Sequence, residues 1–281
     1  MSKKKISYQG EPGANSHIAC NEQYPDYQAV ACRTFEDAFA AIESGDVELG
    51  MIPIENSVAG RVADIHHLLP QSDLNIIGEY FLPIHHQMLG LKGAKLADIK
   101  SIHSHIHALG QCRNIINDMD LQAVTEVDTA GAARWLSQEG DKTQASISST
   151  LAGQIYGLDV LKENIEDAEH NTTRFVVLAK NGARAKQGDG KIVTSFVFRV
   201  NNVPAALYKV MGGFATNGIN MTKLESYQID GRFTATQFYA DVEGHPDDEG
   251  LKFAMEELEF FTDFSRILGV YKAGELRDQL T

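Results

Sequence analysis

Polar residues follow a strand-like segment near residue 52. The segment IPIENSVAG, at 52–60, passes from an apolar run into a turn that carries Asn56 and Ser57. In open α/β sheets, ligands bind beyond the carboxyl ends of the strands, so these two side chains are well placed to hold a polar ligand. An ordinary helix N-cap at either residue explains the same pattern, and spacing alone does not separate the two explanations.

A second polar segment, NTTRF at 171–175, stands just ahead of an apolar strand. It places two hydroxyl groups next to the guanidinium of Arg174. A guanidinium can bind a substrate carboxylate through two parallel hydrogen bonds. A structural salt bridge would use Arg174 equally well, so both roles stay open.

Three histidines, His103, His105 and His107, alternate in the segment SIHSHIHAL. On a strand they would share one face, which suggests a metal site. No HExxH or facial His/Asp pattern accompanies them, so we expect no metal. The three cysteines stand far apart without a CxxC spacing, so we expect neither a disulfide framework nor a structural zinc site.

The glycines of YQGEPGANS, at 8–16, lie between an expected strand and an expected helix. Backbone N–H groups at such a place can bind an anion, and a simple tight turn has the same sequence. The spacing is not GxGxxG, so we expect no nicotinamide cofactor.

Length and charge exclude several classes of protein. A chain of 281 residues accommodates about two domains. Its net charge is -13 and no basic stripe follows any element, which argues against a nucleic-acid partner. No run of about 18 apolar residues occurs, and the N-terminal segment lacks the apolar core of a secretion signal. We therefore expect a cytoplasmic protein that does not bind membranes.

The upstream part alternates short apolar runs with helical patterns, which predicts an α/β fold with substantially parallel sheets. Expected helices cover residues 15–23, 59–69, 130–139 and 149–156. The segment NGARAKQGDGK, at 181–191, is rich in glycine and charge and is typical of an interdomain linker.

Downstream of the linker the expected order is strand, helix, two strands, helix and strand. This βαββαβ order is the ferredoxin-like plan. Pro204 would stand in the first turn of the first helix, and Asn217-Gly218 would end that helix.

Together, the segments GEPGANS, PIENSVAG, SHIHALGQC, DTAGAA, ISSTLAGQIYGL and NTTRF resemble the prephenate dehydratase family in the same order along the chain. The resemblance implies a catalytic domain at 1–180 made of two α/β lobes of the type II periplasmic-binding kind. One lobe would hold 1–78 and 173–180, and the other 79–172. The linker at 181–191 would lead to an ACT regulatory domain at 192–281.

The resemblance also implies the reaction. Prephenate would lose carbon dioxide and its ring hydroxyl to give phenylpyruvate, without a cofactor. Such a reaction needs a proton donor for the departing hydroxide and groups that fix two carboxylates. The family pattern implies that Thr173 serves the leaving oxygen and that Arg174 positions substrate. The other residues implied at the site are Asn56, Ser57, Ser104 and, as a lesser candidate for the acid, Glu55. His107 stands where the family commonly has glutamine, so it would take over that substrate contact.

In the ACT-type domain, the resemblance implies a site for L-phenylalanine as feedback effector and assembly as a homodimer or homotetramer. The matching effector segments are altered: Ala205-Ala206-Leu207 replaces a Gly-Ala-Leu, and Glu225-Ser226 is followed by Tyr227-Gln228 instead of Arg-Pro. Asn202, three residues before the first of these segments, is also expected at the effector site.

Three other functions fit parts of the same sequence. Arogenate dehydratase is one, because arogenate differs from prephenate only in an amino group in place of the side-chain keto group. A non-catalytic amino-acid sensor is another, because lobed binding domains and ACT domains can simply bind small molecules. A metalloenzyme that uses the histidines is the third.

Overall fold

The structure is a computed structural model that describes residues 3–168, 170–228 and 235–277. The chain folds as two compact units. Unit 1 comprises Met1–Val62 and Phe81–Phe175, and unit 2 comprises Ala63–Tyr80 and Val176–Thr281. The domain and lobe bounds implied by the family resemblance stay a prediction, because these units divide the chain differently.

Unit 1 begins with a parallel sheet in the order β3-β1-β2. Its strands are β1 (Lys5–Gln9), β2 (Gln28–Cys32) and β3 (Leu49–Asn56), and β3 turns back into the short antiparallel β4 (Gly60–Arg61). The helices α1 (Asn15–Gln23) and α2 (Phe35–Ser44) connect the parallel strands. The Thr34 hydroxyl caps α2 by accepting from Asp37 N–H, and Gly45 ends it at a φ of 84°. Because the three strands are parallel, their carboxyl ends lie at the same edge of the sheet. Asn56, the last residue of β3, lies at that edge.

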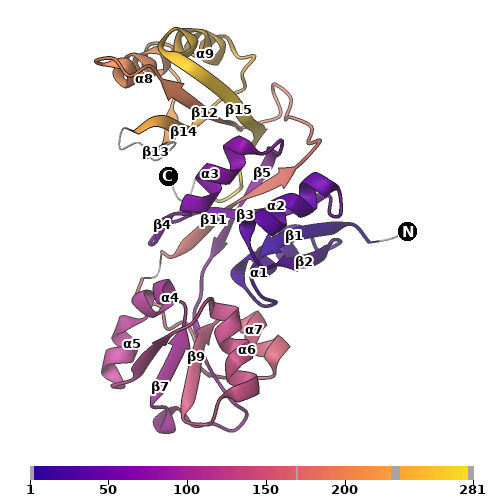
Figure 1. The fold of residues 1–281 in the computed structure, drawn as a ribbon, viewed down its shortest axis with the longest axis vertical. Helices are drawn as coiled ribbons and strands as arrows, with labels where there is room; N and C mark the ends of the chain where they lie inside the picture. Colours follow the sequence, from indigo (N-terminus) through magenta and orange to yellow (C-terminus); the bar gives the residue numbers. More distant parts are fainter. Residues whose placement is uncertain (1–2, 169, 229–234, 278–281) are drawn as a thin grey trace. The chain divides into compact units, whose positions relative to one another are not determined.

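A second sheet of unit 1 has the order β10-β6-β9-β7-β8. Its strands are β6 (Gln87–Gly90), β7 (Ser101–Ser104), β8 (Gln122–Thr125), β9 (Gln144–Ser148) and β10 (Asp159–Lys162). A 3-10 turn, η1 (Leu96–Asp98), precedes β7. One apolar core lies under α4 (Ile106–Gln111) and α5 (Arg113–Asp118), and a second under α6 (Thr129–Glu139) and α7 (Thr150–Tyr156). The helices therefore cover both faces of this sheet (Figure 1).

The glycine turn after β1 is built for close packing. Gly13 has a φ of 95°, and a Cβ on it would lie 2.6 Å from the Cα of Ala152 in α7. Its N–H donates to His17 Nδ1 at 3.1 Å, and its carbonyl accepts from the Ser149 hydroxyl at 2.5 Å. Only glycine fits both the backbone angle and the contact, so the tight-turn explanation of this segment accounts for its sequence.

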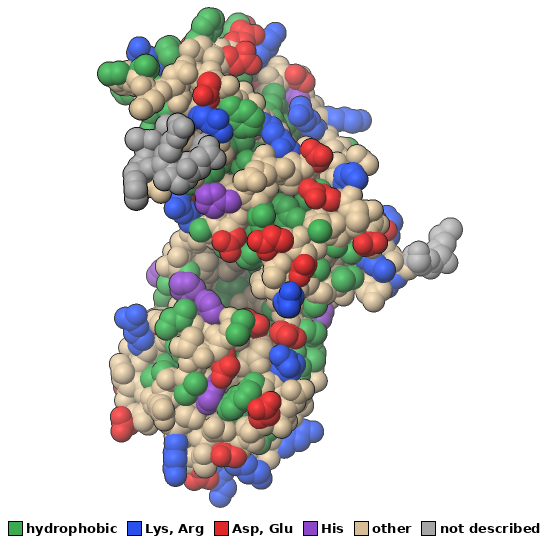
Figure 2. Space-filling view, in the orientation of Figure 1, with side chains coloured by type: hydrophobic (Ala, Val, Ile, Leu, Met, Phe, Trp, Pro, Cys, Tyr) green, Lys and Arg blue, Asp and Glu red, His purple; other side chains and the backbone are tan. Residues whose placement is uncertain are grey.

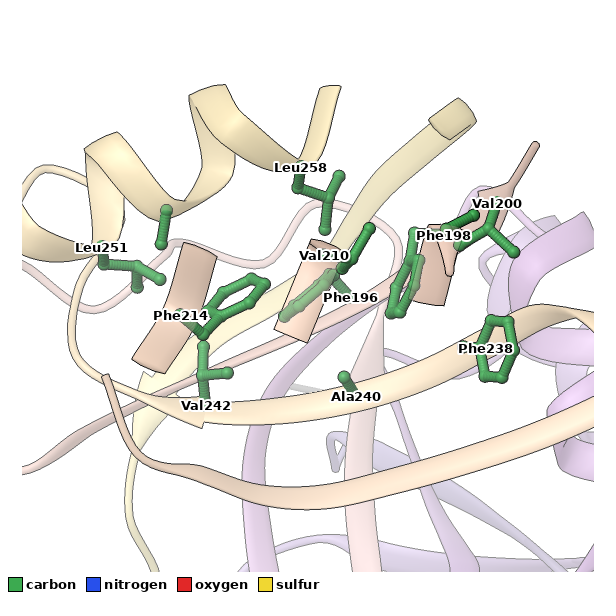
Figure 3. Packing of buried hydrophobic residues seen from close by; sticks show 12 residues of the cluster. Phe196, Phe198, Val200, Val210, Phe214, Phe238, Ala240, Val242, Leu251 and Leu258 are labelled. Atoms are coloured by element: carbon green, nitrogen blue, oxygen red, sulfur yellow. The ribbon is translucent and has the colours of Figure 1, made fainter. Parts of the chain in front are cut away.

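Unit 2 contains the βαββαβ order β12 (Ile192–Val200), α8 (Ala206–Thr216), β13 (Met221–Gln228), β14 (Ala235–Glu243), α9 (Glu249–Phe261) and β15 (Thr262–Lys272). The strands form an antiparallel sheet in the order β13-β14-β12-β15. Figure 3 shows aromatic and aliphatic side chains of the sheet, among them Phe196 and Phe198, packed against Phe214 of α8 and Leu251 and Leu258 of α9.

Further elements extend unit 2 beyond the ferredoxin-like part. It also holds α3 (Ala63–Gln71) and part of β5 (Asn75–Pro83), which pairs with β15 at Ile76 and Gly269. Strands β5 and β11 (Thr172–Ala179) each have residues in both units. On β5, the Glu79 carboxylate accepts two hydrogen bonds of 2.7 Å from Arg277 near the C-terminal end of the chain. This ion pair is almost fully buried, with side-chain exposures of 0% and 7%.

The predicted fold class, an α/β part followed by a βαββαβ domain, is confirmed. Two details differ. The helix expected at 59–69 begins only at Ala63, because Gly60–Arg61 pairs back onto β3. Pro204 lies before α8, not in its first turn, because Ala205 has a φ of 63° and the helix begins at Ala206. Gly218 has a φ of 70° after the end of α8, as expected for that position.

Charged side chains of both signs are interspersed over the face of the protein shown in Figure 2. Within the described ranges, no helix has the length and apolar character needed to cross a membrane.

Candidate functional site

The turn after β3 lies against the start of β11. Ser57 N–H donates to Thr172 O at 2.9 Å, and Thr172 N–H donates to Ser57 Oγ at 2.9 Å. The Ser57 hydroxyl in turn donates to His170 O at 2.6 Å. Two of these hydrogen bonds join the two polar segments that the sequence singled out, and the third reaches the residue just before NTTRF, so PIENS and NTTRF form one site in unit 1.

Asn56 is at the centre of this site. Its amide nitrogen lies 3.0 Å from Thr173 Oγ1, 2.8 Å from Asn171 Oδ1 and 3.2 Å from Thr172 O. Its carbonyl oxygen accepts from the N–H groups of Val58 and Ala59 at 3.0 and 2.7 Å. Since both ends of the amide are engaged, its orientation is fixed, and the amide nitrogen is the donor toward Thr173.

Arg174 forms an ion pair with Glu55, with Nη1 and Oε1 2.9 Å apart. The guanidinium also lies 6.0 Å from the centre of the Phe81 ring. The Arg174 side chain is 4% exposed, whereas that of Glu55 is 29% exposed. Buried charge requires a partner, so the structural salt bridge that the sequence left open is present, and Glu55 is the member of the pair that meets solvent.

A chain of hydrogen bonds extends the site to the end of α4 and to the residue before β6. Asn171 Nδ2 donates to Gln111 Oε1 at 3.2 Å, and the same oxygen lies 2.8 Å from His86 Nε2. Burial lowers the pKa of His86, so its ring is neutral and Nε2–H donates to Gln111. Sequence reasoning gave no role to His86, Gln111 or Asn171, although the last two stand inside motifs that it quoted.

The three alternating histidines do not share a strand face, so that expectation was wrong. Strand β7 ends at Ser104, and His105 begins α4 as its N-cap, accepting from His107 N–H at 3.3 Å. His103 points elsewhere: its Nδ1 lies 3.0 Å from Glu126 Oε1, and its ring stacks 4.2 Å from that of Trp135. Among the described residues, no group of three or more His, Cys, Asp or Glu side chains is arranged to hold a metal ion.

Ser104 and His107 occupy different environments. Ser104 is fully buried, and its hydroxyl donates to Ile147 O at 2.7 Å. His107 lines an open cavity of about 640 Å³ together with Val58 and Ala59 of the turn after β3 and Gln111 of α4. The cavity thus borders the Asn56 site, and its volume suits a small organic ligand.

A second, smaller cavity of about 390 Å³ lies elsewhere in unit 1, lined by His85, α1 and α7. His85 Nδ1 is 2.8 Å from Glu166 Oε1, while Glu166 Oε2 accepts from His86 N–H at 2.8 Å. A histidine held by a carboxylate beside a cavity is an arrangement that general-base catalysis uses. The sequence does not suggest this pair, because Glu166 is 81 positions away from His85.

The residues expected to bind an effector lie in unit 2. Asn202 and Ala205 are exposed before α8, Ala206 is buried, and Leu207 packs against the core of the ferredoxin-like part. On β13, Glu225 pairs with Lys223 at 3.2 Å, and the neighbouring Ser226 is exposed. The described residues thus place the two segments at the start of α8 and on β13; their role in binding stays a prediction.

The fold and the hydrogen-bonded site define a two-lobed α/β domain joined to a ferredoxin-like domain. Residues 6–183 match the family model described as "Prephenate dehydratase". The chain belongs to the prephenate dehydratase family.

A Komagataeibacter europaeus protein, "Bifunctional N-acyl-homoserine lactone acylase/prephenate dehydratase", is 47% identical over 97% of this chain and 97% of its own length. An Arabidopsis thaliana "Arogenate dehydratase/prephenate dehydratase 1, chloroplastic" is 38% identical over 96% of this chain and 72% of its own length. The solved structure of a prephenate dehydratase in complex with L-Phe from Arthrobacter aurescens superposes with a TM-score of 0.87 at 28% identity, covering 95% of this chain and 89% of the other. The recognition made from sequence is confirmed.

Proposed function

We propose that this chain is a prephenate dehydratase that converts prephenate to phenylpyruvate, water and carbon dioxide. The observation that carries the proposal is the hydrogen bond from Asn56 Nδ2 to Thr173 Oγ1. Because the Thr173 oxygen already accepts a hydrogen bond, its own hydrogen is directed to another acceptor. The departing ring hydroxyl of prephenate is that acceptor in our proposal.

The reaction needs few groups because aromatisation of the ring drives it. The bond to the ring hydroxyl breaks as the ring carboxylate leaves as carbon dioxide, so no carbon-bound proton has to be removed. A hydrogen bond from Thr173 stabilises the charge that develops on the leaving oxygen, the Asn56 amide stabilises the Thr173 oxygen, and the departing hydroxide takes up a proton from solvent to become water. His107 lines the cavity that borders this turn and is proposed to hold a substrate carboxylate, while the N–H groups of Val58 and Ala59 keep the Asn56 amide in place.

The first test compares two substrates. Purified protein is assayed for phenylpyruvate from prephenate and for phenylalanine from arogenate. We expect higher kcat/KM with prephenate; higher kcat/KM with arogenate would make the chain an arogenate dehydratase, an activity named for the Arabidopsis relative. Binding of prephenate in calorimetry without turnover of either substrate would favour a non-catalytic sensor.

We further propose that the ferredoxin-like domain is an ACT domain that binds L-phenylalanine as a feedback effector, that the chain assembles as a homodimer or homotetramer, and that it acts in the cytoplasm. The L-Phe complex of the Arthrobacter aurescens relative supports the choice of effector. Titration of L-phenylalanine into the prephenate assay tests regulation, and light scattering tests the assembly.

A second candidate function is hydrolysis of N-acyl amides. The Komagataeibacter europaeus relative carries the name of an N-acyl-homoserine lactone acylase as well as that of a dehydratase. In this chain, the observation that favours such an activity is the His85–Glu166 pair beside the smaller cavity. Release of homoserine lactone from an N-acyl-homoserine lactone tests it directly.

A further inference from the structure

We propose that His85 is the general base of a hydrolytic site in the smaller cavity of unit 1, separate from the dehydratase site, and that this site takes amides with an unbranched, medium-length acyl chain. The proposal rests on the second candidate function above and gives that function a place and a substrate class. Four observations support the proposal. They are the His85–Glu166 pair, the exposure of His85 to solvent, the residues that line the cavity, and the difference between this cavity and the one at the dehydratase site.

The pair has the geometry of an oriented base. Glu166 binds His85 Nδ1 through one oxygen and His86 N–H through the other, each at 2.8 Å. Burial alone would raise the pKa of Glu166, but these hydrogen bonds outweigh it and lower the pKa. An ionised Glu166 therefore accepts the proton of Nδ1, which leaves the lone pair of His85 on Nε2.

Exposure separates the two members of the pair. The Glu166 side chain is 8% exposed, whereas that of His85 is 56% exposed. The two ring nitrogens of an imidazole lie on different edges, so Nε2 is on the edge away from the buried carboxylate. Since His85 lines the cavity, Nε2 can accept a proton from a water molecule there.

The lining of the cavity combines apolar walls with amide and hydroxyl groups. Ile18, Leu82 and Leu151 supply apolar surface, and Asn15, Asn21 and Thr150 supply polar groups. A volume of about 390 Å³ is at the lower end of the range for small-molecule sites. An acyl chain would contact the apolar walls, and an asparagine amide could donate to the carbonyl oxygen as it gains negative charge.

The reaction balances without a cofactor. Water gives a proton to His85 Nε2 while its oxygen bonds to the acyl carbon. The tetrahedral intermediate then collapses, the carbon–nitrogen bond breaks, and the proton on Nε2 passes to the leaving amine. The products are a carboxylic acid and a free amine. Glu166 is a positioning residue, because it acts on the substrate only through His85.

The two sites have different cavity linings, although Glu166 accepts from the backbone N–H of His86, whose ring belongs to the hydrogen-bond chain of the dehydratase site. None of the side chains that line the larger cavity lines the smaller one. Within the described part of the chain, His85 makes no hydrogen bond to Asn56, Thr173 or His107. Substitution of His85 should therefore leave prephenate turnover unchanged.

The experiment measures amine release from N-decanoyl-L-homoserine lactone and N-acetyl-L-homoserine lactone by the full-length protein. His85→Gln should lower kcat at least about 100-fold, as expected for loss of a general base. Glu166→Gln should lower kcat with KM unchanged. Leu151→Trp should raise KM for the decanoyl substrate only. His67→Gln, which alters an exposed histidine of unit 2, is the matched control and should change nothing.

Each outcome decides one claim. With the wild-type protein, about fourfold higher kcat/KM per added methylene would support an apolar acyl site. Hydrolysis that survives in His85→Gln would overturn the location and leave the second function standing. If the wild-type protein releases no amine, both the hydrolytic function and its location at His85 are wrong. Prephenate turnover in the same preparation would show that the protein is folded and that the dehydratase proposal is not affected.

Discussion

At the scale of single residues, the direction of one hydrogen bond determines what Thr173 can do. Threonine is a weak acid, and it helps a leaving group only if its hydrogen points at that group. In this protein Asn56 Nδ2 lies 3.0 Å from the threonine oxygen, and the other end of the amide is fixed by two backbone N–H groups. The orientation of Asn56 thereby makes Thr173 a donor.

The first prediction concerns that hydroxyl. Thr173→Ala should lower kcat for prephenate by at least about tenfold, which corresponds to roughly 1.4 kcal/mol of transition-state stabilisation. Thr173→Ser keeps the hydroxyl and should retain most of the rate. Thr172→Ala, one position earlier, is the matched control. Steady-state phenylpyruvate formation measures all three, and wild-type turnover in Thr173→Ala would remove this residue from the mechanism.

The second prediction reverses the hydrogen bond. Asn56→Asp keeps an oxygen for the N–H groups of Val58 and Ala59 but replaces the donor with a carboxylate. Thr173 would then donate to Asp and not to substrate, and the new charge would repel the carboxylates of prephenate. We expect a larger loss of kcat/KM than in Thr173→Ala, about 100-fold or more. An equal melting temperature would show that folding is intact; a smaller loss than in Thr173→Ala would contradict the proposed direction.

At the scale of elements, the sequence predicted most helices and strands, but it did not predict where a strand ends early and a helix begins. The helix at Asn15–Gln23 has the predicted bounds, and the order of β12 to β15 follows the apolar pattern. The expected histidine strand failed because β7 is only four residues long and His105 caps a helix. Histidine is not among the residues that usually cap helices, so nothing in the sequence marked that change.

The start of α8 gives the third prediction. Ala205 has a φ of 63°, a backbone conformation that costs a residue with a Cβ about 1 kcal/mol. Ala205→Gly should therefore raise the melting temperature by about 2–4 °C if unfolding of a unit of this size is cooperative. Ala215→Gly, inside α8, should lower it. Calorimetry measures both, and a drop with Ala205→Gly would mean that the strain is smaller than the cost of the extra freedom that glycine gives the unfolded chain.

At the scale of the whole molecule, the site and the buried pair both join segments far apart in sequence. Asn56 and Thr173 are 117 positions apart, and Glu79 and Arg277 are 198 apart. Sequence reasoning found PIENS and NTTRF separately and brought them together only through a family resemblance. It gave no sign of the contact between Glu79 and Arg277, because their meeting depends on the pairing of β5 with β15.

The fourth prediction concerns this buried pair in unit 2. Arg277→Met leaves the Glu79 carboxylate buried without its main partner, which typically costs about 3–5 kcal/mol. Glu79→Leu combined with Arg277→Met removes the charges of this pair but also takes Arg277 away from the buried Asp241 carboxylate, which lies 3.7 Å from it, so the double variant should recover only part of the loss. Urea unfolding of the full-length protein compares the single and double variants. Equal losses in the two would show that the lost stability does not come from leaving the Glu79 carboxylate without Arg277.

The hydrogen bond from Ser57 N–H to Thr172 O also bears on how this protein ages. An asparagine amide is lost when the backbone nitrogen of the next residue attacks its side chain, and asparagine is accordingly counted among the thermolabile residues. At Asn56 that nitrogen belongs to Ser57 and is held at 2.9 Å from Thr172 O. Such a loss would yield aspartate or isoaspartate, and the first of these is the change that the second prediction expects to disable the enzyme. The bond that positions the turn therefore also protects the stored protein from chemical inactivation at Asn56.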